Sequence, residues 1–446
     1  MIGLISKLNE LNKFHLFYEE SINEKLLIKE NVMNNINYYE EIGYRLKECK
    51  NNCVRKYKMI DESELIHILN LSINKNELPG VNPSNLEDLI TEVHKLSAKL
   101  HDESEIKYSC KDIKKYFQEL IEMIKDINKT AKTDITFTQK NCLKISTNLL
   151  DHNLKQFVFE YSCLVQIQYM NKNNNLKKRI FTCGERNNGF LQLYNLKNEI
   201  KDFFMKELSI DINENNLKGK YDLILSPEVA SLFMHEAIGH LLEADNFEQN
   251  EYGLDIGKVV GPVFLNVIDD PTLEHMSGSF VFDDEGTEAA KKYLIKDGII
   301  ANKLGNIEFS IKEGRLLAGN ARALDINYEP IIRMSNTYIK PGSDDIVSKI
   351  DNRERVIYLD EILGGNTNQN IFFMSVGKVY LFENGRKAEC LNGMTISLDI
   401  IDSIRKISLV GNDLKWIHGG MCGKKSQNPL PVSMGSPHIM IKDILI

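Results

Sequence analysis

One predicted helix constrains this chain more than any other segment, because it carries two histidines beside an acidic residue. Its start is marked at residues 226–228 by a serine that can cap the helix, a proline suited to the first helical position and a glutamate in the first turn. His235 and His240 then enclose Glu236. Imidazoles bind zinc, and a carboxylate can deprotonate the water that zinc activates. The segment therefore predicts a hydrolytic zinc site in which Glu236 takes that proton and returns it to the leaving amine.

The spacing of the two histidines requires a distorted helix. The usual zinc-binding pair is four residues apart, about 40° around a helix, whereas a pair five residues apart diverges by about 140°. His235 and His240 are five apart. One widened turn of the π type would bring both rings to one ion, and Gly239 makes such a distortion less costly. The alternative is a pair of ordinary histidines on an amphipathic helix.

A catalytic zinc site with two histidines needs a third protein ligand if one position stays open for water. Nearby candidates are Glu243 and Asp245, and distant ones are His418, Cys422 and His438. Glycines on both sides of Cys422 would let its backbone come close to a buried ion. The residue types alone leave these alternatives open.

Composition places the chain among ordinary globular proteins. It has 446 residues, of which 42% are hydrophobic and 26% are charged, enough to bury a sizeable core. These values exclude a mainly disordered protein, a collagen-like repeat and a small disulfide-bonded scaffold. The formal net charge of −8 gives no support to a role in coating nucleic acid, which needs an excess of basic residues.

The sequence gives no indication of a membrane protein or a secreted one. No stretch approaches the ~18 consecutive apolar residues of a membrane-spanning helix. Charges interrupt the first residues too soon for a signal peptide, and the eight cysteines are expected to be reduced thiols. We therefore expect a cytoplasmic protein with neither a membrane nor a nucleic-acid partner.

The first half of the chain is predicted to be a mixed α/β lobe. Apolar residues recur at helical spacing over 84–101 and 111–129, and a further helix is expected at about 190–207. Runs rich in β-branched and aromatic residues predict strands, the last two of which form a hairpin, at 24–30, 41–48, 53–60, 156–170 and 178–184.

The second half is predicted to be rich in β-structure. Turn dipeptides such as those at 297–298 and 384–385 recur between short strand-like runs, and a polar, turn-prone stretch at 213–216 marks the boundary. The predicted fold class is therefore α+β. An N-terminal α/β lobe at 1–210 is followed by a β-rich C-terminal lobe at 211–446, which carries the predicted zinc helix.

Two charged runs are expected to have structural roles. The basic run at 177–179 is interpreted as a solvated hairpin edge. The acidic run at 283–285 is interpreted as a turn, although it has the ligands that a hard cation prefers.

Several blocks of the second half resemble the TldD/PmbA family of metallopeptidases. Residues 235–245 are similar to the zinc helix of that family. Later family blocks resemble, in the same order, residues 282–286, 294–298, 333–342, 364–365, 380–385, 422–424 and 431–437. Each block is short, but their occurrence together in this order makes the match specific. The first ~200 residues match less specifically, because the glycines that mark the early strands of the family are sparse.

The resemblance implies a metal centre and a mechanism. It assigns His235, His240 and Cys422 as ligands of a Zn²⁺ cofactor and Glu236 as the residue that activates water. His418 has no counterpart in the family pattern.

The resemblance also implies partners. Family members are cytosolic peptidases that act on unstructured peptides, including leader peptides of ribosomally made natural products. They form dimers with themselves or with a paralogue that lacks the metal motif. Their zinc site faces an enclosed cavity between two lobes, where the substrate lies extended as an added β-strand.

Two classes of function follow. The first is a zinc-dependent peptidase, favoured because Glu236, both histidines and Cys422 are all present. The second is a non-catalytic peptide-binding or scaffold subunit of a TldD/PmbA-type hetero-oligomer, which would be expected to lack the motif.

Overall fold

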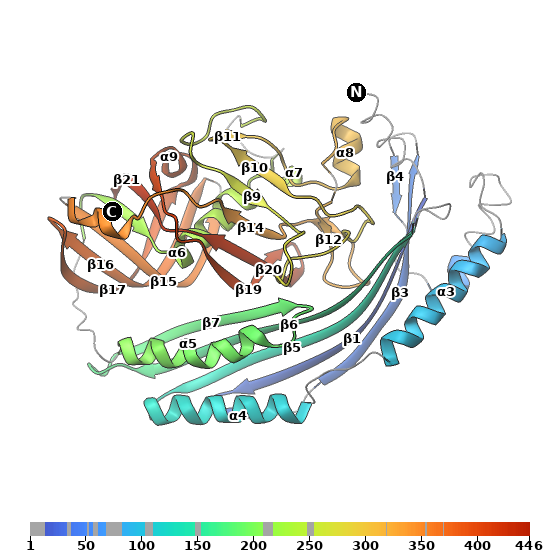
Figure 1. Ribbon diagram of the computed structural model, residues 1–446, viewed down its shortest axis with the longest axis horizontal. Helices are drawn as coiled ribbons and strands as arrows, with labels where there is room; N and C mark the ends of the chain where they lie inside the picture. Colours follow the sequence, from blue (N-terminus) through green and yellow to red (C-terminus); the bar gives the residue numbers. More distant parts are fainter. Residues whose placement is uncertain are drawn as a thin grey trace.

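The chain has an α+β fold, with one long curved sheet in its first half and two shorter sheets in its second (Figure 1). The computed structural model describes residues 14–33, 37–50, 53–56, 61–67, 83–102, 110–147, 153–207, 217–247, 254–317, 319–352, 355–368 and 370–446.

The long sheet is antiparallel throughout and runs in the order β4-β3-β1-β5-β6-β7, with β2 paired to β1. Its strands are β1 (Phe14–Lys29), β2 (Val32–Met33), β3 (Asn37–Lys50), β4 (Cys53–Lys56), β5 (Lys132–Thr147), β6 (Asn153–Met170) and β7 (Leu176–Arg186).

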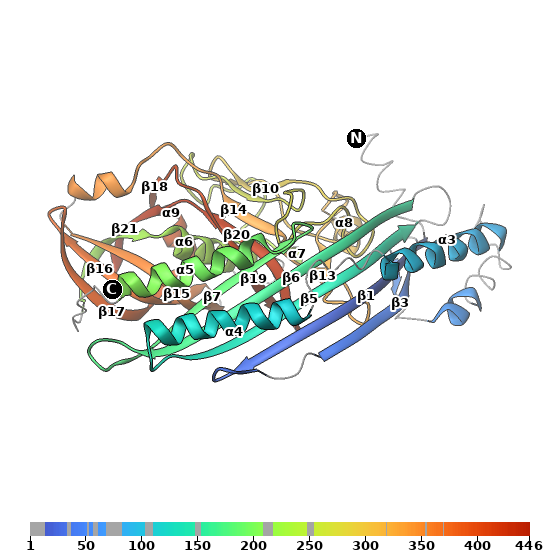
Figure 2. The same ribbon diagram turned by 60° about the horizontal axis from the view of Figure 1, so that its bottom comes forward.

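Helices cover one face of this sheet, and the C-terminal half of the chain lies against the other face (Figures 1 and 2). Helices α4 (Cys110–Ile127) and α5 (Leu191–Glu207) pack on the sheet through a core that includes Phe117 and Phe137. Along β5, Phe137 points to the helices, whereas Lys144 points the other way and pairs with Asp284 at 2.6 Å. Alternate residues of a strand face opposite sides, so β5 contacts both layers. Helix α3 (Pro83–Asp102) lies towards the far end of the sheet.

Two six-stranded sheets and a two-stranded sheet, in which β12 (Ala321–Arg322) pairs with β13 (Ile331–Ile332), lie in the described part of the second half. The first has the order β11-β10-β9-β14-β20-β19, with strands β9 (Val267–Asp269), β10 (Lys292–Lys296), β11 (Ile299–Ile300), β14 (Asn336–Ile339), β19 (Lys415–Lys424) and β20 (Gln427–Ser436). The second has the order β17-β16-β15-β8-β21-β18, with strands β8 (Lys220–Leu225), β15 (Arg355–Asn368), β16 (Ile371–Glu383), β17 (Arg386–Asp399), β18 (Ile407–Val410) and β21 (Ile439–Leu445).

Helix α6 (Pro227–Met234) lies between these two sheets. It contacts β8, β15 and β16 of one sheet and β14, β19 and β20 of the other. Its apolar side chains join the largest core of the molecule, in which Phe233 packs against Phe372 at a ring-centroid distance of 5.6 Å. The smaller elements of this half are α7 (Ala244–Phe247), α8 (Ile307–Glu313), α9 (Ile400–Arg405), β12 (Ala321–Arg322) and β13 (Ile331–Ile332).

Most of the predicted elements are present. The predicted strands at 24–30 and 41–48 fall largely within β1 and β3, the predicted hairpin is formed by β6 and β7, and the three predicted helices correspond to α3, α4 and α5. The strand predicted at 53–60 is observed as β4, and its last four residues lie outside the described residues. Strand β5 was not predicted. Its polar residues, which face the C-terminal half, dilute the hydrophobic pattern of a strand that is paired on both sides.

The interpretation of the basic run at 177–179 as solvated is wrong for Arg179. Its side chain is 7% exposed and donates two hydrogen bonds, of 3.1 and 3.0 Å, to the carboxylate of Glu228. The acidic run at 283–285 does form a turn, but the turn is buried, and Asp283 accepts three backbone N–H bonds. Both runs connect layers of the fold, which a local charge pattern does not reveal.

The two halves meet where the last strands of two sheets touch. Strand β7 ends the long sheet, β19 ends the sheet containing β20, and the two strands are in contact. At the contact, a Cβ added to Gly419 would lie 2.3 Å from the carbonyl carbon of Cys183, so only glycine allows the backbones to approach this closely.

The predicted boundary between 1–210 and 211–446 falls between α5 and β8, in residues 208–216, which lie outside the described residues. It stays a prediction. No helix in the described part of the chain is long and apolar enough to cross a membrane.

Candidate metal centre

The helix that carries the two histidines begins as its sequence predicts and then widens. The side chain of Ser226 caps α6 by accepting a hydrogen bond of 3.3 Å from the backbone N–H of Val229. After Met234 the chain continues as a π-helical turn, η1 (His235–Gly239). The backbone N–H of His240 donates to the carbonyl of His235 at 3.2 Å. This hydrogen bond spans five residues instead of four, and it is the widened turn that the spacing of the histidines requires.

Gly239 is needed for packing as well as for flexibility. Its φ is not positive, so the backbone conformation itself does not demand glycine. A Cβ added there would lie 1.9 Å from the sulfur of Met334, a residue that is fully buried. The π turn is therefore pressed against the segment that leads into β14, and a larger residue at 239 would displace it.

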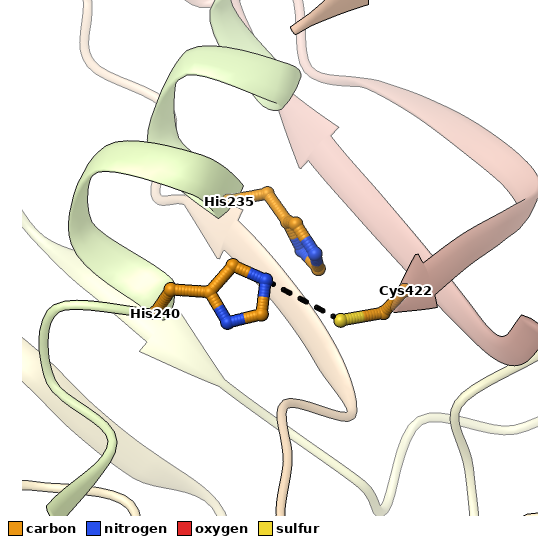
Figure 3. A group of neighbouring side chains, drawn as sticks. All are labelled: His235, His240 and Cys422. Atoms are coloured by element: carbon orange, nitrogen blue, oxygen red, sulfur yellow. Dashed lines mark hydrogen bonds between the residues drawn. The ribbon is translucent and has the colours of Figure 1, made fainter. Parts of the chain in front are cut away.

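The turn brings both histidines to one cysteine from the far end of the chain (Figure 3). The ligand atoms of His235, His240 and Cys422 all lie within 4.8 Å of one another. Nε2 of His240 is 3.5 Å from Sγ of Cys422, and the two imidazole rings are inclined by 79° at a centroid distance of 5.2 Å. All three side chains thus converge on one point.

Cys422 is held in place by its strand and by a buried arginine. It lies on β19, opposite Leu430 of β20. Arg333 is 0% exposed, and its guanidinium donates to the carbonyls of Cys422 at 2.5 Å and of Gln427 at 3.3 Å. Donation to both strands fixes the hairpin, and with it the direction of the thiol.

The electrostatics of the site favour a thiolate. Burial alone would raise the pKa of Cys422, but the adjacent imidazoles of His235 and His240 lower it to about 4. Burial would lower the pKa of His240, but Glu243 and Cys422 raise it well above its ordinary value. Both shifts favour a thiolate next to a protonated imidazole when no metal is bound.

A buried carboxylate orients one of the rings. Glu243 is fully buried, and its Oε2 lies 3.0 Å from Nδ1 of His240, which leaves Nε2 of that ring facing Cys422. Lys424 donates to the same carboxylate oxygen at 2.9 Å, to Asp245 at 2.7 Å and to the carbonyl of Ile332 at 3.1 Å. A carboxylate behind a ligating imidazole sets the ring orientation and raises its basicity.

The arrangement fits zinc. Zinc bonds of about 2.3 Å to sulfur and 2.0 Å to nitrogen at a tetrahedral angle place the two ligand atoms about 3.5 Å apart, as observed for Cys422 and His240. Nδ1 of His235 is buried and has no hydrogen-bond partner among the described residues. Three soft or borderline donors, one of them a thiolate, leave a fourth position open, as in catalytic zinc sites.

The other candidates suggested by the sequence lie outside this group. Glu243 and Asp245 are engaged by Lys424 behind the ligands, whereas His418 and His438 line a separate cavity. Glu236 lies in η1 and is partly exposed, and its carbonyl accepts a hydrogen bond of 3.3 Å from the hydroxyl of Thr367.

Lys424, Arg333 and Met334 were not predicted to support the site. Their only signal in the sequence is membership of the blocks at 333–342 and 422–424 that resemble the family. Their contacts join segments about ninety residues apart, which no local pattern encodes.

The comparisons with known proteins agree on one family. The model of the PmbA/TldA metallopeptidase C-terminal domain matches residues 218–446. A metalloprotease of Methanocaldococcus jannaschii is 32% identical over 385 residues, which are 80% of this chain and 83% of that protein. A zinc metalloprotease TldD homolog of Saccharolobus solfataricus is 36% identical over 231 residues, 51% of this chain and 52% of that protein. The chain thus spans about half the length of several relatives that it matches.

The fold is shared with a solved structure at low sequence identity. TldE from Thermococcus kodakarensis aligns over 100% of this chain and 99% of its own, with a TM-score of 0.69 and 14% identity. This likeness concerns the fold alone. The family model matches residues 218–446, and the relative from M. jannaschii is 32% identical over 80% of this chain. The chain therefore belongs to the PmbA/TldD family of metallopeptidases.

Proposed function

We propose that this protein is a zinc-dependent peptidase that hydrolyses unstructured peptides, including leader peptides. The observation that carries the proposal is the convergence of His235, His240 and Cys422 within 4.8 Å of one another. We propose that these three residues hold Zn²⁺ through two nitrogens and one thiolate. A scaffold subunit without activity would not need a thiolate held between two oriented imidazoles.

Glu236 is the proposed general base. When bound, zinc acts as a Lewis acid that brings the pKa of water to about 7. Glu236 follows His235 directly in the π turn, and the residue is partly exposed. It accepts the proton of the attacking water and returns it to the leaving amine. The hydrogen bond from Thr367 to the carbonyl of Glu236 ties this turn to β15.

The edge of β15 supports an extended substrate. Strand β15 pairs with β8 only from Val356 to Leu359, although its pairing with β16 extends to Asn368. Within the described residues, the remaining edge of 362–368 has no strand partner and passes η1 at Thr367. Residues 364–368 are exposed. An extended peptide can add to such an edge through main-chain hydrogen bonds, whereas most main-chain groups of a folded protein are already paired.

The test is hydrolysis of an unfolded-peptide library by the zinc-loaded protein. Glu236→Gln should lower the rate by about 10²-fold or more, because the base is lost while the ligands remain. Glu274→Gln, at an exposed glutamate, is the matched control and should keep full activity. Cys422→Ala should lose both activity and bound zinc. Full activity in Glu236→Gln would overturn the mechanism, and an absence of zinc from the wild-type protein would overturn the proposal.

Assembly and location are part of the proposal. We propose a dimer, either of this chain with itself or with a paralogue, to be checked by light scattering of the purified protein alone and after co-expression. We also propose a cytoplasmic location, because the described cysteines Cys142, Cys163, Cys183, Cys390 and Cys422 are buried and free, as in a reducing compartment.

A further inference from the structure

A cavity lies between the two halves of the molecule, and none of the three residues of the candidate metal centre lines it. It has a volume of about 350 Å³ and is lined by β7 and α5 on one side and by the start of α6, β15 and β19 on the other. His235, His240 and Cys422 do not line it. Cavities of about 300–1,000 Å³ are the usual size for small ligands.

The contact between β7 and β19 separates the cavity from the metal centre. Along β19, Trp416 and His418 line the cavity, Gly419 touches the backbone of β7, and Cys422 reaches the metal centre. Six residues of β19 separate Trp416 from Cys422, and they span at most about 20 Å because the strand is irregular between Ile417 and Gly420. A ligand in the cavity is therefore not in contact with the metal ligands.

The charges of the cavity are unbalanced towards the acidic side. Arg179 is already held by both oxygens of Glu228. Asp360, which is partly buried, and Glu199, which is exposed, also line the cavity, and the charge of Arg179 acts on both carboxylates. Lys415 is exposed at the rim. The lining thus carries the carboxylates of Glu199, Glu228 and Asp360 against the cations Arg179 and Lys415, and this excess of negative charge favours a cation over an anion.

The pKa values of neighbouring groups reflect this negative potential. Burial first, and then the charge of Glu228, raise the pKa of Glu199, whereas the charge of Arg179 lowers it. Burial and the charge of Asp360 raise the pKa of Tyr358. Both shifts are in the direction that nearby negative charge produces.

Aromatic rings complete the lining. Trp416 and His418 of β19 and Tyr358 of β15 are part of the lining, and the ring of Trp416 also packs against Tyr338 at a centroid distance of 5.2 Å. Nε2 of His438 lies 2.9 Å from the hydroxyl of Tyr358, and its Nδ1 lies 2.6 Å from Asp413, which fixes the tyrosine ring. Aromatic faces beside carboxylates suit ammonium and guanidinium groups.

We propose that this cavity binds an organic cation, an alkylammonium or guanidinium group held by Asp360 and Glu199 against Trp416. An anionic ligand would be repelled by the carboxylates of the lining. A neutral apolar ligand would remove water from them without replacing it. Nδ1 of His418, which is buried and has no partner among the described residues, supplies a further polar contact.

Trp416 makes the proposal directly measurable, because it is the only tryptophan of the chain. Titration with agmatine, which carries both cationic groups, should change the tryptophan emission to saturation, in the zinc-loaded and in the metal-free protein alike. The double substitution Asp360→Asn with Glu199→Gln should weaken this binding by about tenfold or more. Asp202→Asn, at an exposed acid on the same helix as Glu199, should leave it unchanged.

The source of the cation is resolved by a second titration. A short unstructured peptide with one arginine is compared with the same peptide carrying citrulline, a neutral isostere. Saturation by agmatine assigns the cavity to a free cation, and saturation by the arginine peptide only assigns it to a basic side chain. Both results support the cationic class. The proposal is overturned if neither probe saturates, if succinate gives the same response, or if the double variant binds agmatine as the wild type does.

Discussion

At the scale of single residues, Lys424 supports the geometry of the metal centre without being a ligand. Its ammonium group forms ion pairs with both Glu243 and Asp245, and so stabilises the fully buried carboxylate behind His240. Removing one partner of a buried charge pair leaves the other charge uncompensated. The support of the imidazole then weakens even though every ligand is still present.

We therefore expect Lys424→Met to weaken zinc binding by about 10–100-fold. The neighbouring Lys425 is 63% exposed and lies 3.6 Å from Asp245, so Lys425→Met should change the affinity little. Competition for zinc with a chromophoric chelator measures the zinc affinity of both variants. Equal affinities for wild type and Lys424→Met would show that the carboxylate does not depend on this lysine.

The pH dependence of metal binding follows from two other residues. Cys422, with a pKa of about 4, is already a thiolate at neutral pH, whereas the pKa of His240 is raised and its ring keeps a proton that zinc must displace. The zinc affinity should therefore increase with pH up to the raised pKa of His240, by about tenfold per pH unit for one displaced proton. Calorimetry in buffers of different ionisation enthalpy should give about one proton released per zinc near neutral pH. A pH-independent affinity would contradict this.

At the scale of elements, the π turn is maintained by its neighbours. The hydrogen bond between His240 and His235 closes the turn, Met334 packs against Gly239, and Thr367 bonds the carbonyl of Glu236. Isolated π turns are rare, so tertiary contacts from β15 and from the segment before β14 stabilise this one.

Gly239→Ala should test this stabilisation. The added methyl group overlaps Met334, which we expect to lower the free energy of unfolding by about 1–3 kcal/mol and to weaken zinc binding. Urea unfolding and zinc titration measure the two effects. The double variant Gly239→Ala with Met334→Ala should bind zinc better than Gly239→Ala alone, because the space is restored. If it does not, the effect of alanine is on the backbone of the turn itself.

At the scale of the whole molecule, the strand-to-strand contact at Gly419 joins the two halves and separates the two sites. Gly419 has a φ of +70°, and a side chain there would meet the backbone of β7. The ion pair of Arg179 with Glu228 and that of Lys144 with Asp284 connect the same layers. The relative position of the halves thus depends on a few close contacts.

Gly419→Ala should lower the free energy of unfolding by about 2 kcal/mol or more, through left-handed strain and the backbone clash together. Gly423→Ala on the same strand is the control, because its φ is not positive and its nearest contact is the flexible side chain of Asn428 at 3.1 Å. Chemical denaturation of both variants measures the difference. Similar stabilities would mean that β7 and β19 can separate without cost.

Local sequence patterns were sufficient to predict those elements whose structure depends on residues close together in the chain. The cap at Ser226, the helices α4 and α5 and the hairpin of β6 and β7 follow from spacing and turn residues within one segment. The widened turn was also predictable, because two histidines five residues apart can reach one ion in no regular helix. The fold class and the family therefore follow from sequence.

Only the tertiary structure decided which distant residues complete the candidate metal site and which charged residues are buried. That Cys422, and not Asp245 or Glu243, completes the group with the histidines depends on β19 passing η1. The burial of Arg179 and the cavity beside Trp416 likewise arise where the halves meet. The physical reason is that a sequence pattern reports interactions within a few residues, whereas ligand geometry and the pairing of buried charges depend on contacts between segments far apart in the chain.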